Sequence, residues 1–164
     1  MQGTSTYFGS DVNFLQANLD AKWMYPIPKG PILVLRGNIG YTLISNKDLN
    51  KMPMSFWFTT GGSTTIRGYS YEEIGPGKEL FVGNIEFQQK LFTPQLYGSL
   101  FYDLGNAAND IFSYHSDNPF YRHQSVGLGF TYQSPVGAIR IAYAIAIDKH
   151  DAPARIQFSI GPDL

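Results

Sequence analysis

Seven segments of this chain alternate apolar and polar side chains with a period of two residues. In segment 138–147 the odd positions hold four isoleucines and one tyrosine, whereas the even positions hold Arg140 and four alanines. Because successive side chains on a strand point to opposite faces, this pattern predicts strands with one apolar and one polar face. The other segments with this pattern are 14–24, 31–43, 80–91, 96–104, 123–133 and 154–161.

The connections between these segments differ in length. Short turns are predicted at 26–30, 93–95 and 134–137, and longer polar connections at 45–79, 105–122 and 148–153. Within the longer connections we expect exposed turns at Asp117-Asn118-Pro119 and from Asp148 to Asp151. Short turns that alternate with long loops are typical of outer-membrane β-barrels, whose periplasmic turns are short.

Two all-β folds fit the alternation. In a soluble sandwich the apolar face would form the core, whereas in a membrane barrel it would face lipid and the polar face would line the lumen. The segments run for about ten residues, longer than the five or six of an average soluble strand. Aromatic residues also lie at strand ends, as in an interfacial girdle: Trp23, Tyr25, Tyr41, Phe92 and Tyr132. Both features favour the membrane barrel.

The composition excludes several classes of function. The 164 residues include 12 basic and 13 acidic side chains, so a net charge of −1 offers no basic field for nucleic acid. There is no cysteine, which excludes disulfides and thiolate metal sites, and His115, His123 and His150 lack the spacing of metal ligands. No nucleophile elbow or paired carboxylates indicate catalysis. We therefore expect no enzyme, no metal, no cofactor and no small-molecule substrate.

The strand count predicts that the chain is part of a larger barrel. No run of about 18 apolar residues is present, so no transmembrane helix is expected. Single-chain bacterial barrels have an even number of strands, with about eight as the minimum. Seven strands would not close in this way, so we expect further strands to precede residue 1. A barrel assembled from several short chains is the alternative.

The most specific motif lies in the longest predicted connection. Residues 61–69 read Gly-Gly-Ser-Thr-Thr-Ile-Arg-Gly-Tyr. A phosphate-binding loop is disfavoured, because no Lys-Ser/Thr follows and no strand–helix unit surrounds the glycines. Inside a barrel, glycines would let a loop fold back tightly, and Arg67 would then meet carboxylates of the lumen.

The loop and later strands resemble a known family. Gly61-Gly62 with Ile66-Arg67-Gly68-Tyr69 resembles the loop-six signature of the BamA/TamA superfamily of outer-membrane assembly and secretion barrels. Further stretches resemble the family's strands: Asn84-Ile85-Glu86-Phe87, Phe101-Tyr102-Asp103-Leu104-Gly105, the hairpin 134–140 and the ending 157–164. Tyr71, Ile74, Pro76 and the final Gly-Pro-Asp-Leu are most similar to the TamA branch. The resemblance covers essentially the whole chain.

This resemblance implies an all-β fold, namely the last seven strands of a sixteen-stranded antiparallel transmembrane β-barrel in the bacterial outer membrane. It implies that Arg67 enters the lumen and pairs with Glu86 and Asp103. The alternation along segments 80–91 and 96–104, which does not depend on the resemblance, also puts both carboxylates on the polar face. Two roles stay open for these three residues, since they would either brace the loop or take part in gating.

The resemblance also implies a role in assembling other membrane proteins. The closing strand, with Gln157, Phe158, Ile160 and Gly161, would form a lateral seam with a first strand outside this chain. Through that seam the barrel would insert or secrete client β-barrel or autotransporter proteins. The implied partners are membrane lipid, the client proteins and a TamB-like inner-membrane or periplasmic protein. A BamA barrel, a two-partner secretion pore and a plain porin are the alternatives.

Overall fold

The computed structural model describes residues 2–3, 14–28, 30–45, 48–115, 117–135 and 137–161. Its main element is one antiparallel sheet in the order β1-β2-β3-β6-β7-β8-β9-β10. These strands are β1 (Gln2–Gly3), β2 (Phe14–Pro26), β3 (Ile32–Ile44), β6 (Glu79–Lys90), β7 (Leu96–Ala108), β8 (His123–Ser134), β9 (Gly137–Ala146) and β10 (Arg155–Gly161). The predicted all-β antiparallel class is confirmed. No described helix is long and apolar enough to cross a membrane.

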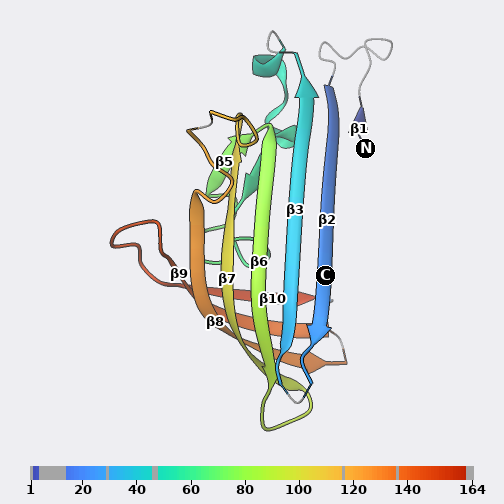
Figure 1. Ribbon diagram of the computed structural model, residues 1–164, viewed down its shortest axis with the longest axis vertical. Helices are drawn as coiled ribbons and strands as arrows, with labels where there is room; N and C mark the ends of the chain where they lie inside the picture. The colour runs from blue at the N-terminus through green and yellow to red at the C-terminus, as the bar shows by residue number, and fades with distance from the viewer. Residues whose placement is uncertain are drawn as a thin grey trace.

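The connection between β3 and β6 has structure of its own. Two short 3-10 helices, η2 (Leu49–Lys51) and η3 (Met54–Phe56), precede a hairpin of β4 (Phe58–Thr60) and β5 (Ile74–Gly77). Residues 61–73 connect these two strands and are called loop 61–73 below. In Figure 1, β4 and β5 lie behind β6 and β7, on the side toward which the sheet curls.

The sheet curls strongly along its strand order. Figure 1 shows β2, β3, β6 and β7 along the long axis, whereas β8 bends and β10 crosses behind them. Strands twist relative to their neighbours, and this twist accumulates across a wide sheet into a hyperboloid wall. Small side chains on the inner face of β9 leave room for this curvature: Ala138, Ala142, Ala144 and Ala146 are all buried. The result is a trough whose concave side holds loop 61–73.

The two faces of the sheet are inverted relative to a soluble protein. On the concave face Asp103 and Ser125 are completely buried, whereas on the convex face Leu19 is 68% exposed. The exposed convex side chains also include Leu15, Trp23, Ile39, Ile85, Leu100, Leu128, Ile141, Ile145, Ile156, Phe158 and Ile160. A sandwich would bury these apolar residues and expose the polar ones. The observed distribution therefore favours a barrel wall with its apolar face toward lipid.

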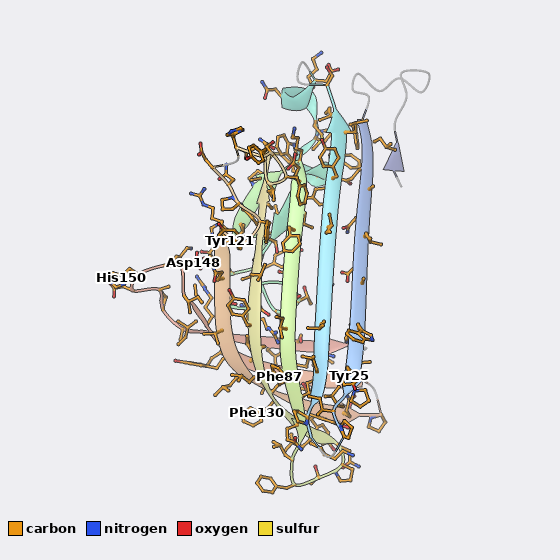
Figure 2. All side chains as sticks on the ribbon, viewed as in Figure 1. Tyr25, Phe87, Tyr121, Phe130, Asp148 and His150 are labelled. Atoms are coloured by element: carbon orange, nitrogen blue, oxygen red, sulfur yellow. The ribbon has the colours of Figure 1, made fainter. Side chains whose placement is uncertain are left out.

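Aromatic side chains gather at the short-turn end of the sheet. Tyr25, Phe87 and Phe130 lie near the lower end in Figure 2. The rings of Trp23 and Tyr25 are 6.0 Å apart. Aromatic rings at one level of a barrel are typical of the membrane–water interface, where one edge contacts lipid and the other water.

Strand β7 continues to Ala108, past the end at residue 104 that alternation indicates. Its last residues still pair with β6, where Asn106 lies opposite Phe81. Asn106 is a polar residue at a position where the alternation along β7 would place an apolar one. The connection between β7 and β8 covers it and accepts its hydrogen bond. The Asn106 amide donates a hydrogen bond to the carbonyl of Pro119 (3.1 Å), and Phe120 packs against Phe81 with ring centroids 5.0 Å apart.

The inverted faces make a testable prediction. Leu128 lies in the middle of β8 and is 56% exposed. If this face contacts lipid, Leu128→Arg should destabilise the full-length protein in vesicles by about 2–4 kcal/mol, the cost of Arg near the bilayer midplane. Urea unfolding would measure this. Met54→Arg on exposed η3 is the control, with an expected change under about 0.5 kcal/mol. Equal effects at the two positions would contradict a lipid-facing surface.

Candidate functional site

The site is built around Arg67 of loop 61–73, whose guanidinium lies between two carboxylates. Its Nε and Nη2 donate to the two oxygens of Asp103 (2.9 and 2.8 Å), and its Nη1 donates to Glu86 (2.6 Å). The backbone N–H of Arg67 also donates to Asp103 (3.0 Å). Asp103 is fully buried, whereas the side chains of Arg67 and Glu86 are 13% and 15% exposed. Hydrogen bonds between a guanidinium and a carboxylate are charge-assisted, and each is stronger than a hydrogen bond between neutral groups.

The register of β6, β7 and β8 places two hydrogen-bond donors beside Asp103, which orient its carboxylate toward Arg67. Asn84, Asp103 and Ser125 lie opposite one another on β6, β7 and β8. The Asn84 amide donates to Asp103 (2.8 Å), and the Ser125 hydroxyl donates to it from the other side (3.2 Å). The same Asn84 amide donates to the carbonyl of Thr65 (2.6 Å). The neighbouring strands therefore fix both the carboxylate and the approaching loop.

An aromatic ring packs against one face of the Arg67 guanidinium, whose edge makes the hydrogen bonds to the carboxylates. The Cζ atom of Arg67 lies 3.3 Å from the ring centroid of Phe101, a cation–π contact. Phe101 in turn lies opposite Gly127 of β8, where a Cβ atom would come within 2.4 Å of the ring. Glycine at position 127 thus leaves the space that the ring of Phe101 occupies.

Glycines shape the loop itself. Gly61 has φ +111°, and a Cβ there would lie 2.4 Å from the carbonyl oxygen of Ser70, so the turn requires glycine. Gly62 also has a positive φ of +103°. A Cβ at Gly68 would lie 2.6 Å from Cβ of Ser125, because the loop backbone rests directly on β8 and β9.

The apolar residues of the motif form a small core between the loop and the sheet. Ile66 is completely buried and Tyr69 is 1% exposed. They pack with buried residues of β5, β6, β7 and β9, namely Ile74, Leu80, Val82, Ala107 and Ala146. This cluster removes apolar surface from water on the otherwise polar concave side, which stabilises the loop in place.

Tyr69 also connects the loop to the turn that follows β9. Its hydroxyl donates a hydrogen bond to Asp148, and Nδ1 of His123 lies 3.1 Å from the same hydroxyl. Burial and the bond to Asp148 raise the pKa of Tyr69, so the phenol stays protonated and donates. Burial alone would raise the pKa of Asp148, but hydrogen bonds from Tyr69 and from the Gln124 N–H hold it below its usual range.

The turn from residue 148 to residue 151 is exposed, as the sequence predicts. Within it the Asp148 side chain is turned inward and is only 17% exposed, because of the long-range contact with Tyr69, which no local pattern indicates. His150, two residues further on, does point away from the sheet in Figure 2.

A second group of contacts joins the loop to the last strand. Nε2 of Gln157 donates to the carbonyls of Arg67 (3.2 Å) and Tyr69 (2.9 Å). Glu73 accepts hydrogen bonds from Lys149 (2.8 Å) and Arg155 (3.3 Å). The hydrogen bond from Lys149, together with the Ser70 N–H, lowers the pKa of Glu73 to about 2. Glu73 is therefore ionised at neutral pH and stays available to both cations.

The remaining residues of the last strand face outward or lie at its end. Phe158 and Ile160 are on the convex face, 59% and 61% exposed. A Cβ at Gly161 would meet no atom within 4 Å, so no contact in the structure requires glycine there. Residues 162–164, which carry the resemblance of the ending, lie outside the described residues.

The structure thus brings together most of the residues singled out from the sequence. Arg67 contacts Glu86 and Asp103, Ile66 and Tyr69 form the core beneath the loop, and Gln157 contacts the loop backbone. Sequence reasoning missed Asn84, Phe101, Ser125, Glu73 and Asp148. The positions of Asn84 and Ser125 on the polar faces of their strands were the available signal. Over the described ranges, no three His, Cys, Asp or Glu residues are grouped as metal ligands.

Comparisons with known proteins agree on one family. A family model described as "Omp85 superfamily domain" matches residues 1–163. The chain is 25% identical over 169 residues to "Outer membrane protein assembly factor BamA" from Nitratidesulfovibrio vulgaris strain Hildenborough, covering 93% of this chain and 21% of the relative. These matches place the chain in the bacterial outer membrane.

A solved structure shows the same fold. The crystal structure of BamA from Haemophilus ducreyi lacking POTRA domains 1-3 matches with a TM-score of 0.63 at 16% identity. The match covers 90% of this chain and 33% of that chain. The chain therefore spans about a fifth of the curated relative's length and a third of the solved chain.

Asp103 is more buried than Glu86, so neutralising the two carboxylates should lower the free energy of unfolding by different amounts. Asp103→Asn should destabilise the full-length protein in vesicles by about 3 kcal/mol, because part of a buried charge pair is left uncompensated. Glu86→Gln should cost about 1–2 kcal/mol, since Glu86 is partly hydrated and accepts one bond from Arg67. Urea unfolding measures the cost, and trypsin cleavage after Arg67 reports release of the loop. A larger effect at Glu86 would contradict this ranking.

Proposed function

Because this chain belongs to the Omp85 superfamily, we propose that it is part of a transmembrane barrel that assembles or translocates other outer-membrane proteins. The proposed process is non-covalent. The contact that carries this proposal is the fork between Arg67, Glu86 and Asp103.

That fork is difficult to explain in a simple pore. Removing three charged groups from water costs free energy, and their attraction repays this cost only when geometry and further hydrogen bonds are good. Here the arginine also holds a loop that reaches across the concave face. Arg36 of β3 donates to the carbonyl of Thr64 (2.6 Å), and Gln157 of β10 donates to that of Tyr69 (2.9 Å). A wall that only encloses a channel does not require one loop to contact strands so far apart.

The free edge of the last strand, β10, is the place where we expect a client strand to bind. One edge of β10 pairs with β9, and no described strand pairs with its other edge. Unpaired backbone groups at a sheet edge can accept a further strand, a process called β-augmentation. We propose that this edge forms the lateral seam, with Gln157 facing the loop, Phe158 and Ile160 facing lipid, and Gly161 allowing a bend.

Resemblance supports a more specific assignment. Tyr71, Ile74 and Pro76 are similar to the TamA branch of the superfamily, and the proposed clients are then β-barrel and autotransporter proteins. The proposed partners are membrane lipid on the convex face and a TamB-like protein of the inner membrane or periplasm. A BamA-type role uses the same loop and seam and differs in its partners.

The proposal is tested with the full-length protein in proteoliposomes. A denatured client barrel is added, and its folding is followed by heat-modifiable gel mobility. Arg67→Ala should slow client folding at least about tenfold, equivalent to about 1.4 kcal/mol in the barrier. Arg67→Lys keeps the charge but loses the fork, so it should also be impaired. Lys51→Ala on exposed η2 is the control and should act as the unmodified protein.

The contrary outcome is equally clear. If the protein forms a large conductance that is unaffected by Arg67→Ala, and does not accelerate client folding, then it is a plain pore.

A further inference from the structure

Loop 61–73 is attached to the sheet at several places, and two of these attachments differ in burial. The first joins Arg67 to β6 and β7 through Glu86 and Asp103, and Gly68 rests against β8. The second joins the loop to β10 and to the connection before it. Arg67 takes part in both, through its side chain in the first and its backbone carbonyl in the second, but the two attachments reach different strands, so each can be examined on its own.

The second attachment uses two kinds of contact. Gln157 donates to two loop carbonyls, those of Arg67 and Tyr69, which are two residues apart. A carbonyl oxygen can only accept, so the donor amide is the feature of Gln157 that this contact requires. Glu73, oriented by the backbone N–H of Ser70 (2.7 Å), binds Lys149 and Arg155.

The two attachments differ in how deeply their charged side chains are buried, and therefore in the free energy needed to open them. In the first, the exposed fractions of Arg67, Glu86 and Asp103 are 13%, 15% and 0%. In the second, those of Glu73, Lys149 and Arg155 are 28%, 44% and 35%. Ion pairs exposed to water are weak and screened by salt, whereas opening a buried pair leaves a charge without compensation. The attachment to β10 therefore opens at a lower free-energy cost than the attachment to β6 and β7.

We propose that Gln157 is the positioning residue for the edge strand, holding β10 reversibly on a loop that Arg67 keeps fixed. Strand β10 can then leave the loop while the loop stays in its place on β6, β7 and β8. Glu73 assists by binding the start of β10 at Arg155 and the preceding connection at Lys149. For client assembly, this inference rests on the proposed function, because β10 is the strand whose open edge a client would meet.

Hydrogen–deuterium exchange of the full-length protein in vesicles tests the inference. Gln157→Glu keeps the shape of the side chain but presents an acceptor to the two carbonyls, so a packing role would survive and a donor role would not. Gln157→Glu and Gln157→Leu should each accelerate exchange of peptide 155–161 by about fivefold or more, because local opening of β10 becomes easier. Exchange of peptide 62–69 should stay within about twofold of the unmodified protein.

Matched variants complete the experiment. Ser159→Ala, on the same strand and parity, should leave exchange of β10 unchanged. Glu73→Gln, at a position whose side chain is 28% exposed, should accelerate exchange of β10 in the same direction as the Gln157 variants. The inference is overturned if Gln157→Glu protects β10 as the native residue does, or if the loop peptide accelerates as much as β10.

Client folding is not part of this readout. If β10 exchanges as expected while Arg67→Ala assembles clients normally, the coupling stands and the proposed function fails. If β10 is unaffected while Arg67→Ala blocks assembly, the coupling fails and the proposed function stands.

Discussion

The buried fork of Arg67 is the interaction on which the arrangement depends. Two unit charges about 4 Å apart attract by about 4 kcal/mol at an effective dielectric of about 20, but each loses several kcal/mol of hydration on burial. The wall compensates by giving Asp103 further donors from Asn84 and Ser125. Arg140 lines the same small cavity as Arg67 and Glu86, and its charge interacts favourably with Glu86. The loop is thereby held where an ordinary surface loop would leave the sheet.

That placement explains why the sheet can be polar inside and apolar outside. The loop lies on the concave face, pairs Arg67 with Asp103 and Glu86, and adds an apolar core at Ile66 and Tyr69. Most of the convex face has no protein cover among the described residues, and its exposed apolar side chains suit contact with lipid. Removal of the loop would expose the concave carboxylates. In the proposed barrel, loop and bilayer would stabilise the same wall from opposite sides.

Local sequence patterns predicted the strands well, because period-two alternation reflects the two faces of each strand directly. The same parity put Glu86 and Asp103 on the inner face, and the loop motif named their partner. The contacts of Glu73 and Asp148 could not be predicted this way. Each joins residues more than about 70 positions apart, through a loop whose path depends on the folded wall. The end of β7 was missed for a similar reason, since Asn106 lies under a distant turn.

A double-mutant cycle on Arg67 and Asp103 tests the central claim most directly. The full-length protein in vesicles would carry Arg67→Met, Asp103→Leu, or both, and urea unfolding would give each stability. If the two charges form one buried unit, the double variant loses less than the sum of the single losses, with a coupling of at least about 2 kcal/mol. Additive losses within about 0.5 kcal/mol would show that the two residues act independently and would contradict the account.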